Sequence, residues 1–288
     1  MNRSIPVYPG LLQSLLLLLA LVILEIGLSV AGTVALMAVG ALSGHPFSPD
    51  DSIQMALLTM AVVTVSYAIL LLWGIYKTKA PFQTLCPLGA FPAKVVLPML
   101  IVSVGIGILL SEADNVLRYF LPMPAFLAGV FKDLYSGNVG SLLILVVVAP
   151  LSEELFFRGL ILRGLRSRYS DPKAVAVSAL LFALVHLNPY QFLGPLILGL
   201  LAGWIFVKTG SLWPCMLLHA FNNGQGWLVQ NVLNLEIPGY SMPDTVPLPH
   251  VFQPLWFDLL GVAFTAAGVL LLGVTLRRPR PAPGSVRF

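Results

Sequence analysis

The sequence predicts an all-α fold, a polytopic membrane helix bundle of about eight transmembrane helices, and three observations support this prediction. The chain of 288 residues is 58% hydrophobic, and its mean hydropathy is +0.91. Only 10% of its residues are charged, whereas a soluble domain has about 25%. Apolar runs of roughly 20 residues, the length that crosses a bilayer as a helix, recur along the chain. These features exclude an ordinary soluble protein.

The first expected span, about residues 11–40, is longer than the apolar region of a signal peptide, so we expect it to be retained. The fourth to seventh spans are short or carry polar residues, which places them inside the bundle. We predict one membrane domain over residues 1–276, with a motif core at 140–232, followed by a basic cytoplasmic tail at 277–288. The remaining expected spans are 53–76, 92–111, 140–162, 173–188, 191–208, 211–232 and 255–276.

The basic residues predict the orientation of the chain. If the N-terminus is cytoplasmic, eight spans place 14 of the 16 basic residues at or near the cytoplasmic face, all except Arg118 and Lys132. We therefore expect an integral cell-membrane protein with both termini in the cytoplasm, whose basic surplus touches anionic lipid. This distribution argues against a nucleic-acid partner, despite the net charge of +4. Two cysteines, Cys86 and Cys215, predict no disulfide framework.

The stretch "APLSEELFFRGL", residues 149–160, places charges in an apolar helix. Glu154 and Arg158 are four residues apart, so they share a helix face and form a pair. Glu153 is rotated by about 100° from Glu154 and faces elsewhere. The spacing leaves Glu153 available as a general base. The alternative is a solvated ion pair at the end of a helix.

Two further stretches place polar side chains in neighbouring expected spans. "SALLFALVHLNPY" contains His186, and "GSLWPCMLLHAFNNGQG" contains His219, Asn222 and Asn223. Taken singly, these side chains are explained as packing or as hydrogen bonds between helices. Taken together with the two glutamates, they provide the groups that activate water and stabilise an oxyanion. Ionisable residues inside a membrane indicate a functional site.

The order of these residues resembles a known family. "EELFFR" fits Glu-Glu-x-x-x-Arg, "FALVH" fits Phe-x-x-x-His and "HAFNN" fits His-x-x-x-Asn. Over about residues 140–232 the chain resembles the CPBP family of intramembrane proteases, also called the Abi or type II CAAX prenyl protease family. The resemblance implies an intramembrane endopeptidase that cleaves a peptide or lipidated protein, such as a prenylated CAAX substrate.

The resemblance also implies roles for individual residues. Glu153 and His186 correspond to the pair that activates the attacking water. His219 and Asn223 match the third motif, which stabilises the tetrahedral oxyanion.

Two further implications concern the first motif and a metal. Glu154 and Arg158 would hold the first motif in shape. A zinc-dependent mechanism is the alternative to a metal-free one, with Glu153, His186 and His219 as ligands and a fourth position open. The sequence leaves both mechanisms open.

The depth of the three motifs predicts a wet cavity below the cytoplasmic surface, because hydrolysis needs water that lipid does not supply. The lone acid Glu25, in the first span, is expected to pair with a neighbouring helix and to do no chemistry. Two other functions stay open. One is a proton-coupled membrane transporter, and the other is a non-catalytic membrane scaffold or immunity protein.

Overall fold

The computed structural model describes residues 8–45, 48, 52–135, 137–241 and 251–277. Every regular element in these residues is a helix, which confirms the predicted all-α class. Five short segments are 3₁₀ or π helices: Ala93–Val95, Ile144–Val148, Leu155–Leu162, Pro189–Gln191 and Val229–Leu233. The α-helices are α1 Leu11–Ser43, α2 Ser52–Thr78, α3 Phe82–Leu85, α4 Val96–Phe120, α5 Ala125–Leu134, α6 Val139–Leu143, α7 Ala149–Glu154, α8 Arg163–Arg166, α9 Asp171–Leu184, α10 Leu193–Thr209, α11 Trp213–Leu228 and α12 Leu255–Thr275.

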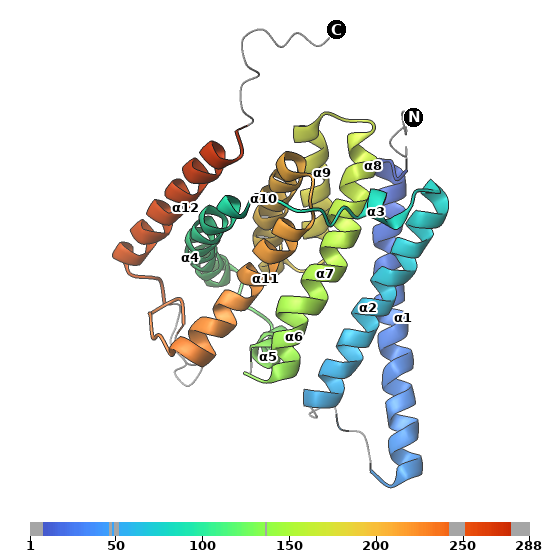
Figure 1. Ribbon diagram of the computed structural model, residues 1–288. Helices are drawn as coiled ribbons and strands as arrows, with labels where there is room; N and C mark the ends of the chain where they lie inside the picture. The colour runs from blue at the N-terminus through green and yellow to red at the C-terminus, as the bar shows by residue number, and fades with distance from the viewer. Residues whose placement is uncertain (1–7, 46–47, 49–51, 136, 242–250, 278–288) are drawn as a thin grey trace.

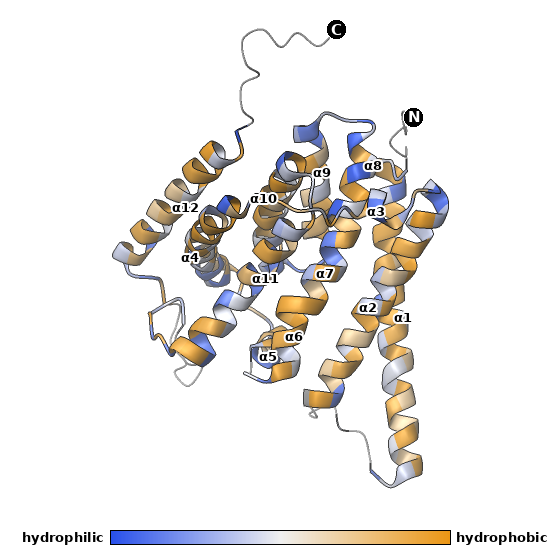
Figure 2. Ribbon diagram, viewed as in Figure 1, coloured by the Kyte–Doolittle hydropathy of each residue, from blue (hydrophilic) through white to orange (hydrophobic). Residues whose placement is uncertain are grey.

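The long helices run up and down through one bundle. The first turn of α1 and the last turn of α12 lie at the same end, together with the turn between α8 and α9 (Figure 1). Hydrophilic residues gather at this end of α2 and at the α8–α9 turn, whereas α1 and α12 are largely hydrophobic (Figure 2). We call this end the basic end, because Lys77, Arg166 and Lys173 lie there. The predicted tail, apart from Arg277, lies outside the described residues.

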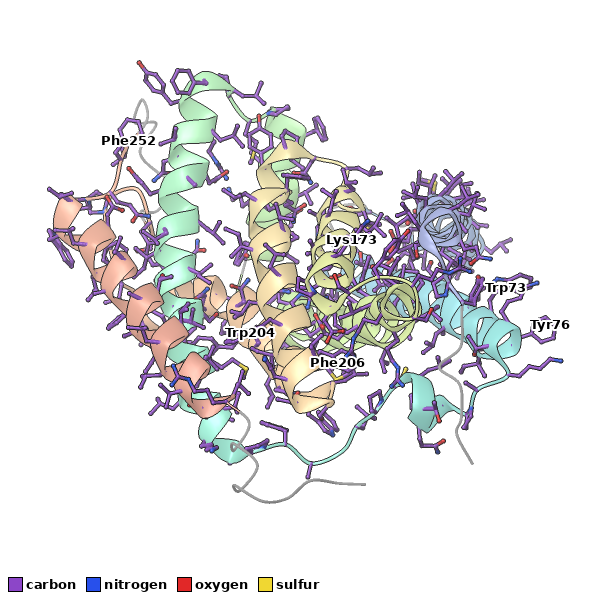
Figure 3. The ribbon with its side chains drawn as sticks, turned by 90° about the horizontal axis from the view of Figure 1, so that it is seen from above. Trp73, Tyr76, Lys173, Trp204, Phe206 and Phe252 are labelled. Carbon is purple, nitrogen blue, oxygen red and sulfur yellow. The ribbon has the colours of Figure 1, made fainter. Side chains whose placement is uncertain are left out.

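Three layers are visible from the basic end (Figure 3). The α1–α2 pair forms one edge, and the α4–α12 pair forms the other. Between them lie α9 and α10, which pack on each other, and α7 and α11, which also pack together. The elements that carry the three motifs therefore occupy the centre of the bundle.

Six of the about eight expected spans meet the criterion of length and composition among the described residues. Six described helical stretches are long and apolar enough to cross a membrane: Leu11–Ser43, Ile53–Thr78, Ala93–Phe120, Val139–Arg166, Pro189–Thr209 and Leu255–Thr275. The fifth and seventh expected spans also fold as helices. α9 has 14 residues, which at 1.5 Å per residue extend over about 21 Å, short of a hydrocarbon core of about 30 Å. α11, with 16 residues, continues directly into the π-helical stretch Val229–Leu233, so its length is close to that of a span, but it carries His219, Asn222 and Asn223 among its apolar residues.

The helix that carries the two glutamates is not uniformly α-helical. Pro150 lies in the first turn of α7 and has no N–H to donate to the preceding turn. The backbone just before it, Ile144–Val148, is a π-helix, and a second π-helical stretch, Leu155–Leu162, follows directly after Glu154. Widened π turns inside α-helices occur often at functional sites.

Two glycines let α4 and α12 approach closely. A Cβ added at Gly268 would lie 2.5 Å from the backbone nitrogen of Val102, and one added at Gly105 would lie 2.4 Å from the nitrogen of Thr265. Small residues at such contacts are how helices pack tightly where lipid surrounds them. The contact fixes the outer edge against which the central layer packs.

Gly268→Ala is expected to lower the free energy of unfolding by about 1–3 kcal/mol, because the added methyl group overpacks the contact with α4. The measurement is the melting temperature of the purified protein in detergent. Gly273→Ala, on the same helix, is the matched control, because a Cβ there meets nothing within 4 Å. Equal melting temperatures for the two variants would contradict the close contact.

Candidate active site

The carboxylate of Glu154 joins two motifs at the centre of the bundle. Its Oε1 atom accepts hydrogen bonds from Arg158 Nη1 at 2.8 Å and from His219 Nδ1 at 2.9 Å. Glu154 is 0% exposed, Arg158 is 1% exposed and His219 is 3% exposed. The predicted pair of Glu154 and Arg158 is therefore present in the structure and fully buried, whereas the alternative of a solvated pair does not fit. The bond to His219 on α11 was not predicted.

These bonds fix how His219 presents its ring. An ionised carboxylate only accepts hydrogen bonds, so the Nδ1 atom of His219 carries a proton and donates it to Glu154. The other ring nitrogen, Nε2, is directed at Glu153, with 3.8 Å between Nε2 and Oε2. Glu153 and Glu154 are thus divided as the helical spacing predicts. One carboxylate orients the imidazole, and the other faces its second nitrogen.

His186 lies just beyond the end of α9. That helix starts with Pro172 in its first turn and ends at Leu184, and Leu187, three residues later, adopts a left-handed backbone conformation with φ of 56°. The His186 ring turns back so that Nδ1 lies 2.9 Å from the backbone oxygen of Phe182. Because a carbonyl oxygen only accepts, Nδ1 is the protonated nitrogen in the neutral ring. Nε2 of His186 keeps its lone pair and is able to take a proton.

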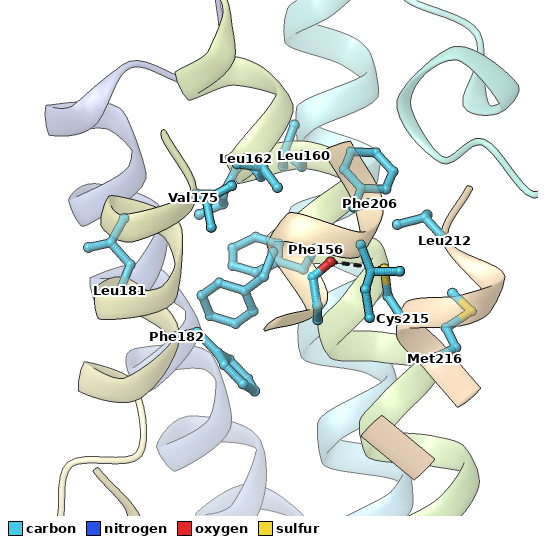
Figure 4. Packing of buried hydrophobic residues seen from close by; sticks show 14 of the residues in the cluster. Phe156, Leu160, Leu162, Val175, Leu181, Phe182, Phe206, Leu212, Cys215 and Met216 are labelled. Atoms are coloured by element: carbon cyan, nitrogen blue, oxygen red, sulfur yellow. Dashed lines mark hydrogen bonds between the residues drawn. The ribbon is translucent and has the colours of Figure 1, made fainter. Parts of the chain in front are cut away.

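The ring of Phe182 is the surface that the motif residues share. Its centroid lies 5.3 Å from the ring of His186, 5.7 Å from the ring of His219 and 4.7 Å from Cζ of Arg158. Phe157 also packs edge-on against Phe182, with 4.9 Å between the two ring centroids. Phe182 belongs to the buried cluster drawn in Figure 4. The phenylalanine of the Phe-x-x-x-His motif thus brings His186 and His219 to one place.

Asn223 lies one turn after His219 on α11, and its Nδ2 atom donates to the backbone oxygen of Leu145 at 3.3 Å. Leu145 belongs to the π-helical stretch before the glutamates, so Asn223 ties α11 to the helix of the first motif. A primary amide has two hydrogens, and this bond uses one of them. The second remains available to another acceptor.

Three buried polar atoms of the first motif have no hydrogen-bond partner among the described residues: Glu153 Oε2, Glu154 Oε2 and Arg158 Nη2. Buried polar groups are normally satisfied by protein or by ordered water. The concentration of such atoms in one place indicates a site that accepts water or a polar substrate group.

One residue near the site was missed from the sequence. Tyr67 on α2 is buried, and its ring packs edge-on against Phe156, with centroids 5.5 Å apart. No sequence motif marks this contact, since Tyr67 comes from the second expected span and Phe156 from the fourth.

The proposed zinc ligands do not form a metal site as arranged. Among the described residues, no group of three His, Cys, Asp or Glu side chains is placed to hold a metal ion. Glu153 Oε2 and His219 Nε2 are 3.8 Å apart. The hydrogen bonds of both histidines use Nδ1, which is also the bonding pattern of a histidine that binds metal through Nε2. The placement of the described side chains nevertheless gives no support to joint ligation by Glu153, His186 and His219.

Comparison with known proteins bears on the same segment. Residues 135–225 match the family model described as Type II CAAX prenyl endopeptidase Rce1-like. The resemblance to the CPBP family is confirmed over this Rce1-like segment. The match contains all six motif residues and supports, at the level of the family, an intramembrane endopeptidase.

Curated relatives match a smaller part of the chain. An uncharacterized 24.3 kDa protein of Escherichia coli is 34% identical over 106 residues, which are 34% of this chain and 48% of that protein. The UPF0177 protein YxdF of Lactococcus lactis is 35% identical over 81 residues, which are 28% of this chain and 44% of that protein. The chain thus spans about half the length of the curated relatives it matches. No solved structure matches the chain.

Arg158→Met is expected to destabilise the protein by about 3–5 kcal/mol, because it leaves the buried Glu154 carboxylate without its cation. The measurement is the free energy of unfolding from a titration with SDS in mixed micelles. The matched control is Arg118→Met, which breaks an i,i+4 pair with Asp114 whose side chains are 42% and 28% exposed. This exposed pair should contribute less than about 1 kcal/mol. A similar loss of unfolding free energy in both variants would contradict the prediction that the buried pair contributes more than the exposed one.

Proposed function

We propose that this protein hydrolyses a peptide bond of a membrane-associated substrate, using water activated by Glu153 and His186 and an oxyanion site formed by His219 and Asn223. One observation carries the proposal. Three positions of the motif residues make no hydrogen bond to the part of the chain that the structure describes: Nε2 of His186, Nε2 of His219 and Oε2 of Glu153, the last two lying 3.8 Å from each other. A site built only for packing would satisfy these atoms internally.

In this proposal, the water is activated by the lone pairs of the Glu153 carboxylate and of His186 Nε2. Glu153 is the acceptor that takes one proton from water, and His186 Nε2 holds the water through a second hydrogen bond. The resulting hydroxide attacks the carbonyl carbon, and the carbonyl oxygen takes up the negative charge. When the C–N bond breaks, the proton held by Glu153 passes to the leaving amine, so the site returns to its starting state.

Stabilisation of the oxyanion is assigned to α11. A doubly protonated His219 keeps Nδ1–H on Glu154 and directs Nε2–H toward the reacting centre. Its charge, together with that of Arg158, balances the two glutamates. The second amide hydrogen of Asn223 provides the other donor. Donors fixed in place before the reaction do not have to reorganise as charge develops, which is the main source of such stabilisation.

Glu154 and Arg158 act as positioning residues in this proposal. They touch the ring of His219 and its neighbour Phe182, but they are held away from the reacting atoms by their own pairing. The substrate class follows from the resemblance: a peptide or lipidated protein in the membrane, with a prenylated CAAX-type substrate as one case. We expect the basic end to face the cytoplasm.

Glu153→Gln and His186→Gln are each expected to slow cleavage by about 10²–10⁴-fold, because each removes a group that handles the proton of the attacking water. The measurement is the rate of cleavage of a prenylated CAAX peptide and of a panel of membrane peptides by the full chain in detergent.

The matched controls are Glu236→Gln and His45→Gln, which make the same chemical changes at residues outside the three motifs. Both controls should cleave at the parental rate, and all four variants should keep the parental elution profile. Parental cleavage by both motif variants would remove the assignment of these roles.

A further inference from the structure

A groove of about 530 Å³ lies between α1 and α2, and none of its lining residues belongs to the candidate active site. It lies toward the basic end, where Trp73 and Tyr76 are at the outer edge of the bundle (Figure 3). The floor is apolar and the rim is polar or aromatic. The floor is lined by Leu16, Leu17, Ala20, Ile69 and Leu70, and the rim by Tyr8, Gln13, Trp73 and Lys77.

Internal hydrogen bonds at the rim occupy an acceptor position on each of two side-chain oxygens and use none of those side chains' own donors. Trp73 Nε1 donates to the hydroxyl oxygen of Tyr8 at 3.1 Å, so the hydroxyl proton of Tyr8 remains to be donated. The side-chain oxygen of Gln13 accepts from the backbone N–H of Gly10 at 2.7 Å, which leaves its NH₂ group. Burial raises the pKa of the Tyr8 hydroxyl, which therefore keeps its proton at neutral pH. The rim offers hydrogen-bond donors to a ligand.

The charge at the rim has the same sign. Lys77 holds its ammonium group 4.7 Å from the centre of the Trp73 ring. The first turn of α1 contains no acidic residue to offset the partial positive charge of a helix N-terminus. No carboxylate is among the described residues that line the groove. Donors and positive charge together select an anion with several acceptor oxygens, such as a phosphate group.

The apolar floor distinguishes between a free anion and a lipid. Leu16 is 55% exposed and Ile69 is 42% exposed, and both belong to helices long and apolar enough to cross a membrane. A free phosphate would leave this floor uncovered, whereas a lipid presents a phosphate and an acyl chain from one molecule. Aromatic side chains such as Trp73 and Tyr8 commonly lie at the level of lipid headgroups.

We propose that this groove binds one anionic phospholipid, with its phosphate at Tyr8, Gln13 and Lys77 and an acyl chain along the floor between α1 and α2. The site is separate from the hydrolytic centre, so it does not depend on the proposed reaction. It would hold the basic end of α1 and α2 at the headgroup level of the cytoplasmic leaflet.

The test measures lipid binding to the full chain in detergent by native mass spectrometry, with dioleoylphosphatidylglycerol and dioleoylphosphatidylcholine as probes. The anionic lipid should bind more tightly than the neutral one, and Lys77→Gln should weaken its binding by about fivefold. Lys173→Gln is the matched control, since this lysine also lies 4.7 Å over an aromatic ring, that of Tyr169, but does not line the groove. It should bind as the parent does.

Two further measurements test the contribution of the floor separately from that of the rim. Ala20→Trp fills the floor and should reduce binding of the anionic lipid, even though every rim residue is retained. Inorganic phosphate at millimolar concentration should not displace the lipid. Equal binding of the two lipids, equal losses in the two lysine variants, parental binding by Ala20→Trp, or displacement by phosphate would each overturn the proposal.

Discussion

The carboxylate of Glu154 is the constraint on which the arrangement of the motif residues depends. It is fully buried, and one of its oxygens binds both Arg158 on its own helix and His219 on α11. A buried carboxylate is costly unless it is paired and hydrogen-bonded, so the fold has to keep both partners in place. Two hydrogen bonds to one atom leave little freedom in how α7 and α11 lie against each other. The orientation of the His219 ring follows from the same two bonds.

The surrounding apolar core makes this polar centre rigid. Phe156 and Phe157 follow the glutamates directly, and both are 0% exposed. Phe157 packs on Phe182, which in turn lies against Arg158 and both histidines. The guanidinium group over an aromatic face gains a further favourable interaction without another charge. Apolar side chains therefore surround the polar groups of the site. Their packing keeps the guanidinium group and the two imidazole rings in defined orientations.

The local parts of this account were accessible from the sequence, and the long-range parts were not. The pairing of Glu154 with Arg158 follows from a spacing of four residues on one helix, and the apolar content gives the all-α membrane class. The link from Glu154 to His219 joins residues 65 positions apart, and no helical periodicity encodes it. The expected spans that do not meet the criterion of length and composition are that of α9, which is short, and that of α11, which carries polar residues.

The protonation state of the His219 ring tests the central claim most directly. The chain has four histidines, so nitrogen-15 labelling of histidine gives a spectrum in which the His219 signals are identified by their loss in His219→Gln. A proton on Nδ1 of His219, in the full chain purified in detergent, is the result that the bond to Glu154 requires. A neutral ring protonated only at Nε2, with a bare Nδ1, would contradict it, because such a ring has no proton to donate to the carboxylate.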